Sequence, residues 1–183
     1  MEIPTESVNF SPPLPRIVLD VLSRSRFCYL GTSEENSPHL CLMCYTFIQN
    51  QELGTGSFIM STKRATKKFA ALVANSRVAV LVHDFHSAAK TSAEDSSDSS
   101  APPIHQTSGT YSVTVYGECE VLIGDEAESV RVLHAQRNPA YRQFILGDDV
   151  SMIRVKPETA RICDINDNVQ TWGQTGSSSP KVT

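Results

Sequence analysis

A cluster of four cations is the strongest chemical signal in this sequence. Lys63, Arg64, Lys67 and Lys68 fall within six residues, just before or within the first turn of a predicted helix. A helix N-terminus already carries a partial positive charge, so acids are normally preferred there. Clustered cations are instead typical of a place where an anion docks against free N–H groups. The cluster predicts a phosphate site; the alternative is a solvated basic face.

Two hydroxyl residues strengthen the phosphate interpretation. Ser61 and Thr62 precede the cations, and either could cap the helix and offer a further hydrogen bond. A single small phosphorylated ligand fits better than a nucleic acid, because no stripe of basic and aromatic residues extends the cluster. The net charge of −4 also argues against a nucleic-acid binder.

The five cysteines predict free thiols in a reducing compartment, the cytoplasm. Their number is odd, and the first 15 residues hold no apolar segment of a secretory signal. Cys41 and Cys44 form a lone CxxC within a predicted strand, where an offset of three places side chains on opposite faces. We therefore expect two separate thiols and no metal site.

The histidines point to no catalytic acid or base. His83 and Asp84 are adjacent on a predicted strand, so they face opposite ways, and His39 and His134 are expected to be structural. The sequence contains no GxSxG, no HExxH and no glycine-rich phosphate loop. The catalytic residues stay unassigned.

These residues must be positioned by a mainly β fold. The 183 residues are 40% hydrophobic and 20% charged, which is typical of one globular domain, and no apolar run approaches the ~20 residues of a membrane span. The pattern predicts strands at 27–32, 39–48, 57–61, 77–85, 111–122, 150–155 and 160–165. Helices are predicted from Pro15, within 61–75, and at 125–137. Because most connections are short, we expect an antiparallel barrel or sandwich with helices outside it.

Three segments are predicted to lie outside this core. Residues 1–12 are interpreted as a flexible lead-in and residues 173–183 as a polar tail. Residues 87–109 are rich in Ser, Ala, Thr and Asp, so they bury too little apolar surface to offset the entropy of ordering. We interpret them as a mobile insertion in a single domain at 13–172.

The order of these segments resembles a known family. The strand 27–32 is followed by the run from Pro38 to Phe47, the strand end Phe58–Thr62, and the helix sequence from Lys68 to Val78. Together with Gly117 in a later strand, this order resembles the pyridoxamine 5'-phosphate oxidase-like family of FMN-binding split barrels. Ser76 replaces the proline of the family's Asn-Pro-Arg-Val motif. The resemblance covers roughly residues 15–165.

The resemblance implies a six-stranded antiparallel Greek-key split β-barrel, a homodimer, and FMN bound at the dimer interface. The following residues would contact the cofactor: Lys67 and Lys68 the phosphate, Ser61 and Thr62 its surroundings, Cys41, Met43, Cys44 and Tyr45 the ring and ribityl chain, and Ser112 the flavin. The second strand, 39–48, is apolar on both faces and is therefore expected to be central, with an outer face that a second subunit covers.

The chain departs from the family where the substrate would bind. The carboxy-terminal Arg-His pair that contacts the pyridoxal ring in the family is missing. Of the Tyr, Arg and Ser residues with which the family binds the substrate phosphate, only Arg137 has a plausible counterpart here. We therefore predict a flavin-dependent oxidoreductase with an unknown substrate rather than a true pyridoxamine 5'-phosphate oxidase. The alternative is a non-catalytic protein that binds flavin or another phosphorylated ligand. Neither nucleic acid nor membrane is an expected partner.

Overall fold

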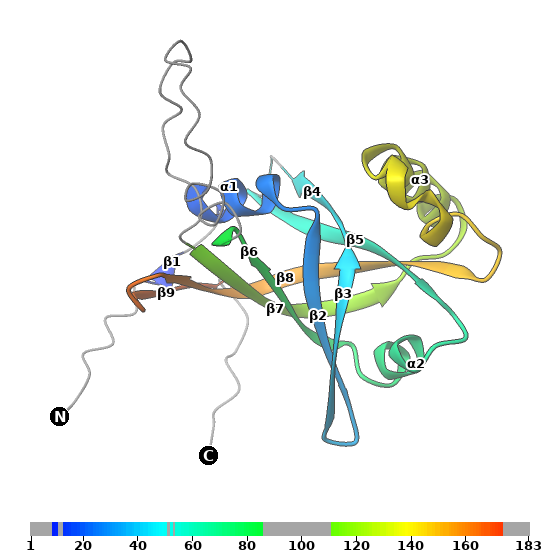
Figure 1. Cartoon of the computed structure of the whole chain (residues 1–183), viewed down its shortest axis with the longest axis horizontal. Helices are drawn as coiled ribbons and strands as arrows, with labels where there is room; N and C mark the ends of the chain where they lie inside the picture. Colours follow the sequence, from blue (N-terminus) through cyan, green and yellow to red (C-terminus); the bar gives the residue numbers. More distant parts are fainter. Residues whose placement is uncertain (1–8, 11–12, 51, 53, 86–110, 174–183) are drawn as a thin grey trace, which may run out of the picture.

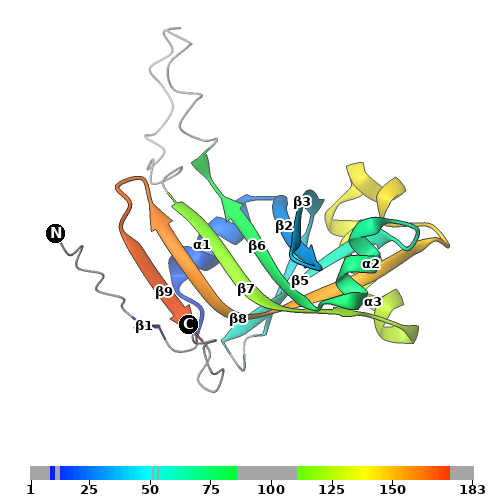
Figure 2. The same cartoon turned by 90° about the horizontal axis from the view of Figure 1, so that it is seen from below.

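The fold is a six-stranded antiparallel barrel that is open along one seam. In the computed structural model, which describes residues 9–10, 13–50, 52, 54–85 and 111–173, the barrel strands are β2 (Phe27–Glu34), β3 (Ser37–Cys44), β5 (Thr55–Lys63), β6 (Arg77–His83), β7 (Tyr111–Val121) and β8 (Val150–Asp164). They pair in the order β5-β8-β7-β6-β2-β3 (Figures 1 and 2). β3 and β5 contact each other, but no ladder joins them within the described residues. The prediction of a mainly β split barrel is confirmed.

Three shorter strands extend the barrel sheet to nine strands within the described residues. β4 (Thr46–Asn50) pairs with β5, and β9 (Val169–Gly173) pairs with the end of β8. β1 (Asn9–Phe10) lies parallel to β9. Asn9 and Phe10 come from the predicted lead-in 1–12, whose other residues, like the predicted insertion 87–109 and the tail beyond Gly173, lie outside the described residues.

Helices lie around the barrel, as expected. They are α1 (Arg16–Arg24), α2 (Lys67–Ala74), α3 (Gly124–Arg137) and the 3-10 helix η2 (Pro139–Phe144). α2 connects β5 to β6 at one end of the barrel, whereas α1 lies near the opposite end (Figure 2). α3 and η2 lie between β7 and β8 in the chain and pack beside β5.

The barrel interior follows the alternation of the sequence. Val78, Val80 and Val82 on β6 point into the core, and Val113 and Val115 on β7 do the same. Helix α1 closes one end through Val18, Val21 and Leu22. Trp172 on β9, a strand that the sequence did not predict, is also fully buried.

The predicted central strand 39–48 is wrong in two respects. The strand is interrupted at Tyr45, so β3 pairs with β2 and β4 pairs with β5. β3 ends the sheet order, and its outward side chains Leu40 and Leu42 are 66% and 59% exposed. The apolar residues on the outer face of β3 are therefore exposed to solvent in a single chain, and they do not indicate a strand with neighbours on both sides.

The predicted strand end at Lys156 and Pro157 is also wrong, because β8 continues through both residues to Asp164. Pro157 lies opposite Gly117, where the β7–β8 register shifts after Tyr116. A proline lacks the N–H that a regular ladder requires, and a bulge tolerates this loss. A glycine within a strand indicates a bulge or a close approach, and Gly117 has both: the register shifts beside it, and a Cβ there would overlap the carbonyl oxygen of Lys156.

Candidate functional site

The seam of the barrel begins at the junction of β3 and β4, where the two strands pair with different neighbours. The β4–β5 ladder ends with the pair Thr46 and Ile59. In a continuous register Cys44 would lie opposite Ser61, and Met43 opposite Thr62. Instead, the chain bends at Tyr45 and the two strand edges separate.

The separated strands leave unpaired edges that face each other. Among the described residues, Cys44 and Met43 pair only with β2, whereas Ser61 and Thr62 pair only with β8. A strand edge of this kind exposes N–H and C=O groups that a ligand can use. A cavity of about 430 Å³ opens between the edges. Its volume falls within the range of cofactor and small-ligand pockets.

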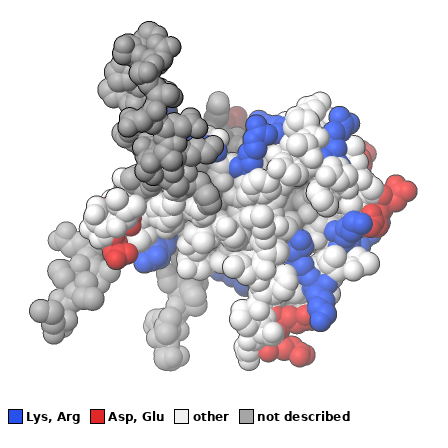
Figure 3. Space-filling model, viewed as in Figure 1, with Lys and Arg blue, Asp and Glu red and all other residues white. Residues whose placement is uncertain are grey.

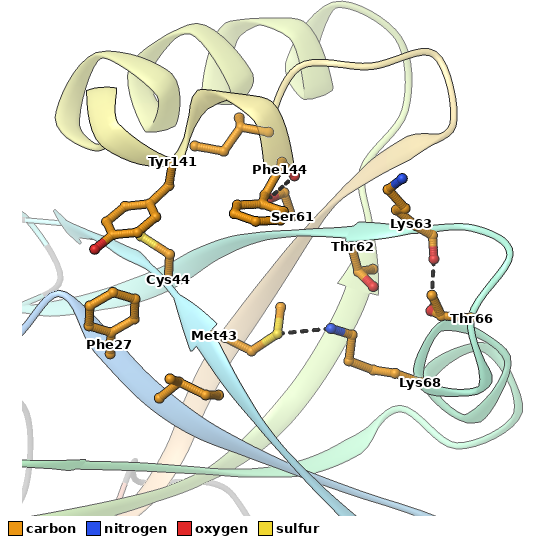
Figure 4. Close-up of a pocket in the computed structure, with 12 residues that line it drawn as sticks. Phe27, Met43, Cys44, Ser61, Thr62, Lys63, Thr66, Lys68, Tyr141 and Phe144 are labelled. Carbon is orange, nitrogen blue, oxygen red and sulfur yellow. Dashed lines mark hydrogen bonds between the residues drawn. The ribbon is translucent and has the colours of Figure 1, made fainter.

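The cavity is lined by residues of both edges, of α2 and of the segment after α3: Phe27, Leu42, Met43, Cys44, Ser61, Thr62, Lys63, Thr66, Lys68, Tyr141, Phe144 and Ile145. Figure 4 shows that its two ends differ in character. Aromatic residues gather at one end, whereas lysine and threonine side chains gather at the other. Such polarity suits a ligand that has a planar ring at one end and an anion at the other.

The apolar end is shaped by η2 and the start of β2. The rings of Phe27 and Tyr141 meet edge to face, with centroids 5.2 Å apart. Oγ of Ser61 donates a hydrogen bond of 3.0 Å to the main-chain carbonyl of Phe144. Ile145 is fully buried beneath this segment. The hydroxyl predicted to lie near a phosphate is therefore used to hold η2 against β5.

The polar end contains two groups whose hydrogen bonding is incomplete. Nζ of Lys68 lies 2.9 Å from Sδ of Met43, and a thioether is only a weak acceptor. Oγ1 of Thr62 is buried, with the residue 3% exposed, and has no hydrogen-bond partner among the described residues. Buried hydroxyls are normally paired. An anion between Lys68 and Thr62 would satisfy both, so the residues present fit a phosphate.

The first turn of α2 is capped by Thr66, so the predicted caps Ser61 and Thr62 are wrong. Oγ1 of Thr66 accepts a hydrogen bond of 3.2 Å from the Phe69 N–H and donates one of 2.8 Å to the Lys63 carbonyl. Ser61 and Thr62 are still in the β5–β8 ladder, and the chain needs the next three residues to turn into the helix. The predicted helix end at Asn75 is confirmed.

The four predicted cations have different roles. Nζ of Lys63 lies 3.5 Å from Asp149, and the Arg64 guanidinium donates to the carbonyls of Asp148 and Val150. These contacts hold the start of β8. Lys67 is exposed and does not line the cavity. Lys68 is the cavity-lining cation with no acidic partner among the described residues.

The cavity brings together five of the nine predicted cofactor-binding residues: Met43, Cys44, Ser61, Thr62 and Lys68. Besides Lys67, Cys41, Tyr45 and Ser112 lie elsewhere. The Cys41 thiol donates to the Leu30 carbonyl, and the Tyr45 hydroxyl is buried and donates 2.7 Å to the Leu22 carbonyl. Ser112 pairs with His83 and Cys163 near the start of β7.

Sequence reasoning missed the aromatic wall of the cavity. Phe27 had been assigned only to a strand, and Tyr141 and Phe144 lie just beyond Pro139, where the predicted helix stops. Their spacing of three residues places them on one face of a short 3-10 turn. That spacing is a weak signal in the sequence, because only the fold shows what the turn covers.

The cysteines are all free, as predicted. Burial raises the pKa of the Cys41 and Cys44 thiols, so both stay protonated at neutral pH. Within the described residues no group of three or more His, Cys, Asp or Glu side chains is placed to hold a metal ion. In the same part of the chain, no helix is long and apolar enough to cross a membrane.

His134 and Asp84 have structural surroundings. Burial lowers the pKa of His134 to about 4, so its ring is neutral at physiological pH. Asp84 is buried, accepts a hydrogen bond of 2.9 Å from the Tyr111 N–H, and lies 3.7 Å from the Arg24 guanidinium. Asp84 therefore ties β6 to β7 and α1.

The fold and the cavity together define a split-barrel protein with a cavity at its seam. The chain belongs to the pyridoxamine 5'-phosphate oxidase family, because the sequence profile described as Pyridoxamine 5'-phosphate oxidase matches residues 14–164. A Schizosaccharomyces pombe protein named as a pyridoxamine 5'-phosphate oxidase homolog is 31% identical over 191 aligned positions, which cover 94% of this chain and 97% of the relative. A Saccharomyces cerevisiae protein with a similar name is 25% identical over 200 positions, covering 92% and 98%.

Solved structures share the fold at low sequence identity. A Clostridium acetobutylicum protein related to general stress protein 26 has a TM-score of 0.58 and 14% identity, over 86% of this chain and 92% of that one. A protein of Mesorhizobium loti described as FAD-binding has a TM-score of 0.56 and 17% identity, over 81% and 94%. A heme binding protein of Mycobacterium smegmatis has a TM-score of 0.60 and 16% identity, over 84% and 55%.

Proposed function

We propose that this protein binds FMN in the seam cavity and acts as a flavin-dependent oxidoreductase. The proposal is carried by two groups at one end of a cavity whose other end is aromatic: the Lys68 ammonium, which donates to the weak Met43 thioether acceptor, and the Thr62 hydroxyl, which has no partner among the described residues. FMN joins a phosphate to a planar ring, so it matches both ends. The FAD-binding description of a structural neighbour supports a flavin.

Different residues of the chain would bind the two ends of the cofactor. Lys68 and Thr62 would hold the phosphate, and Phe27 and Tyr141 would flank the ring. When bound, a flavin supplies hydride and electron transfer, and the protein supplies position and electrostatics. Ile145 and Phe144 would exclude water from the ring.

A second copy of the chain is part of this proposal. Tyr29, Leu40, Leu42, Ala79 and Leu81 occupy outward positions on neighbouring strands β2, β3 and β6, and none of them is charged. The middle of this face is largely free of charged side chains (Figure 3). An apolar face beside a free strand edge needs cover, and Leu42 connects this face to the cavity. A homodimer would provide that cover.

We further propose that pyridoxamine 5'-phosphate is not the substrate. The guanidinium of Arg137, the one candidate for a substrate-phosphate contact, donates to the Phe47 carbonyl and lies in a different cavity from Lys68. Correct placement of a substrate against the flavin accounts for a large part of the rate enhancement, and a small misplacement lowers the reaction rate about 10²-fold. We propose the cytoplasm as its location, because all five cysteines are free thiols.

The second candidate function is flavin or phosphate-ligand binding without catalysis. It is favoured by the absence, among the cavity-lining residues, of a carboxylate or imidazole that could move a proton. The Cys44 thiol stays protonated because burial raises its pKa.

An absorption spectrum of the purified protein tests the proposed cofactor. We expect flavin bands that remain after dialysis and are restored by FMN. A colourless protein that FMN titration leaves unchanged would contradict the proposal. Anaerobic mixing of the FMN complex with NADH or NADPH then separates the two functions, because bleaching of the flavin band indicates an oxidoreductase. Formation of pyridoxal 5'-phosphate at about 0.1–1 per second would contradict the proposed exclusion of that reaction.

A further inference from the structure

A buried polar network links helix α3 to the wall of the seam cavity. The Cys44 thiol donates a hydrogen bond of 3.0 Å to Oδ1 of Asn138. Nδ2 of Asn138 donates to Oγ1 of Thr46 at 3.0 Å and to the main-chain carbonyl of His134 at 3.0 Å. Oγ1 of Thr46 lies 2.8 Å from Nδ1 of His134. The side chains come from β3, β4 and α3.

Three of the four network residues, Thr46, His134 and Asn138, are buried, whereas Cys44 is half-buried at the cavity wall. His134 is 0% exposed and Asn138 is 2% exposed. Nδ2 of Asn138 also lies 3.2 Å from Nδ1 of His134, so this ring nitrogen faces two possible donors, the amide and the Thr46 hydroxyl. Burial lowers the pKa of His134 to about 4, which keeps the ring neutral. Buried polar networks fix the arrangement of the elements they join, and here the joining hydrogen bonds are made by Cys44, Asn138 and Thr46. Nε2 of His134 is buried without a partner among the described residues.

Asn138 occupies a decisive place in the chain. It is the C-cap of α3, and the next residue, Pro139, begins η2. η2 carries Tyr141 and Phe144, which form the aromatic wall of the cavity. The segment between the α3 helix and this wall is thus held by the same amide that accepts the Cys44 thiol.

We propose that Asn138 is a positioning residue for the ring end of the seam cavity. Through Cys44 on one side and Thr46 and His134 on the other, it fixes the start of η2 and thereby the place of Tyr141 and Phe144 over a bound ring. The inference rests on the proposed flavin site. It concerns the ring end alone, whereas Lys68 acts at the phosphate end.

Riboflavin and FMN provide probes that separate the two ends, since riboflavin lacks the phosphate. Asn138→Ala should weaken the binding of both by a similar factor, about tenfold. Lys68→Ala should weaken FMN binding alone and leave the riboflavin Kd within about twofold. Asn138 does not itself line the cavity, so its substitution removes no direct contact with the ligand.

Two further variants keep the test valid if Asn138→Ala fails to fold. Cys44→Ala removes the thiol donor, and Cys44→Ser keeps a donor at the same place. We expect Cys44→Ala to weaken riboflavin binding about tenfold and Cys44→Ser to restore it. Cys163→Ala is the matched control, because this half-buried thiol lies on β8 away from the cavity and donates to the Asp164 carbonyl. It should leave both affinities unchanged.

Hydrogen exchange supplies a second readout. Amides in residues 140–146 should exchange faster in Asn138→Ala and Cys44→Ala than in the wild type, and should be unaffected in Cys163→Ala. The inference alone would be overturned if the wild type binds riboflavin and both Cys44→Ala and folded Asn138→Ala bind it with the same affinity. A wild-type chain that binds neither FMN nor riboflavin would overturn the proposed function, and with it this inference.

Discussion

Nζ of Lys68 on α2 reaches across the seam to lie 2.9 Å from Sδ of Met43 on β3 (Figure 4). A thioether is only a weak acceptor for a charged ammonium. A phosphate oxygen in the same place would be a far better acceptor. This pair of residues therefore supports the proposed anion end of the site more directly than the number of cations in the sequence does.

Lys68→Ala should weaken FMN binding by about 1.5–3 kcal/mol, the range for losing a hydrogen bond to a charged group. Lys63→Ala is the matched control, because Lys63 is exposed and already paired with Asp149. Its effect should be several times smaller. Calorimetric titration with FMN measures both, and equal, negligible losses would locate the phosphate elsewhere.

Thr62→Val should have opposite effects on the free and the bound protein. The buried Oγ1 of Thr62 has no hydrogen-bond partner among the described residues, so an isosteric methyl group removes a desolvated polar atom without breaking a bond. The free energy of unfolding without ligand should stay the same or rise by up to about 1 kcal/mol. FMN affinity should fall. Urea unfolding and FMN titration test this; a destabilised free protein would contradict it.

Gly117→Ala should destabilise the barrel severely, by about 3 kcal/mol or more. The added Cβ would overlap the Lys156 carbonyl oxygen, which belongs to the backbone of a paired strand and cannot rotate away. Gly31→Ala is the control, because the nearest atom to its Cβ would be the Ala79 oxygen at an ordinary 3.5 Å. Thermal unfolding of both variants should differ by many degrees; similar midpoints would show that the bulge can relax.

The stability of the protein should fall as the pH drops from about 6.5 to about 4, partly because of His134. Burial lowers its pKa from 6.5 to about 4 in the folded state, so the unfolded chain takes up a proton first. The neutral His134 contributes at most about 3 kcal/mol to the free energy of unfolding through this linkage. The contribution is fully present above pH 6.5 and is lost as the pH falls toward 4.

Comparison with His134→Gln isolates that contribution. Hydrogen bonds lower the pKa of Glu120 and Asp164, so these carboxylates lose stabilisation at still lower pH in both proteins. Urea unfolding between pH 7 and pH 4.5 should give a steeper decline for the wild type. Parallel declines would show that His134 is not neutralised by burial.

Leu40→Glu should convert the expected dimer to a monomer, raising the dimer Kd at least tenfold, or about 1.4 kcal/mol. Leu40 is 66% exposed on the apolar face of β3 and does not line the cavity. Ile165→Glu is the matched control, since Ile165 is 64% exposed beyond the end of β8. Analytical ultracentrifugation of the three proteins decides the matter, and a wild-type monomer at all concentrations would contradict a homodimer.

The sequence by itself determined the elements whose residues carry a local signal. Alternating valines on β6, the apolar stripe of α2 and the unusual Gly117 each identify their element, because strand and helix periodicity depend on neighbours in the chain. The local pattern gave a cluster of four cations, and the family resemblance singled out Lys67 and Lys68 from it. The family resemblance then related these elements to a split barrel.

The tertiary structure alone decided where the seam opens and what surrounds it. Whether Leu40 and Leu42 are enclosed or outward depends on which strand β3 pairs with, and pairing partners distant in the chain leave no periodic signal. The same reason explains why Tyr45 entered the core and why Pro157 was tolerated within β8: each depends on a residue of another strand. The aromatic wall from η2 and the buried link from Asn138 to Cys44 likewise exist only once α3 packs beside β5, because residues 94 positions apart then meet.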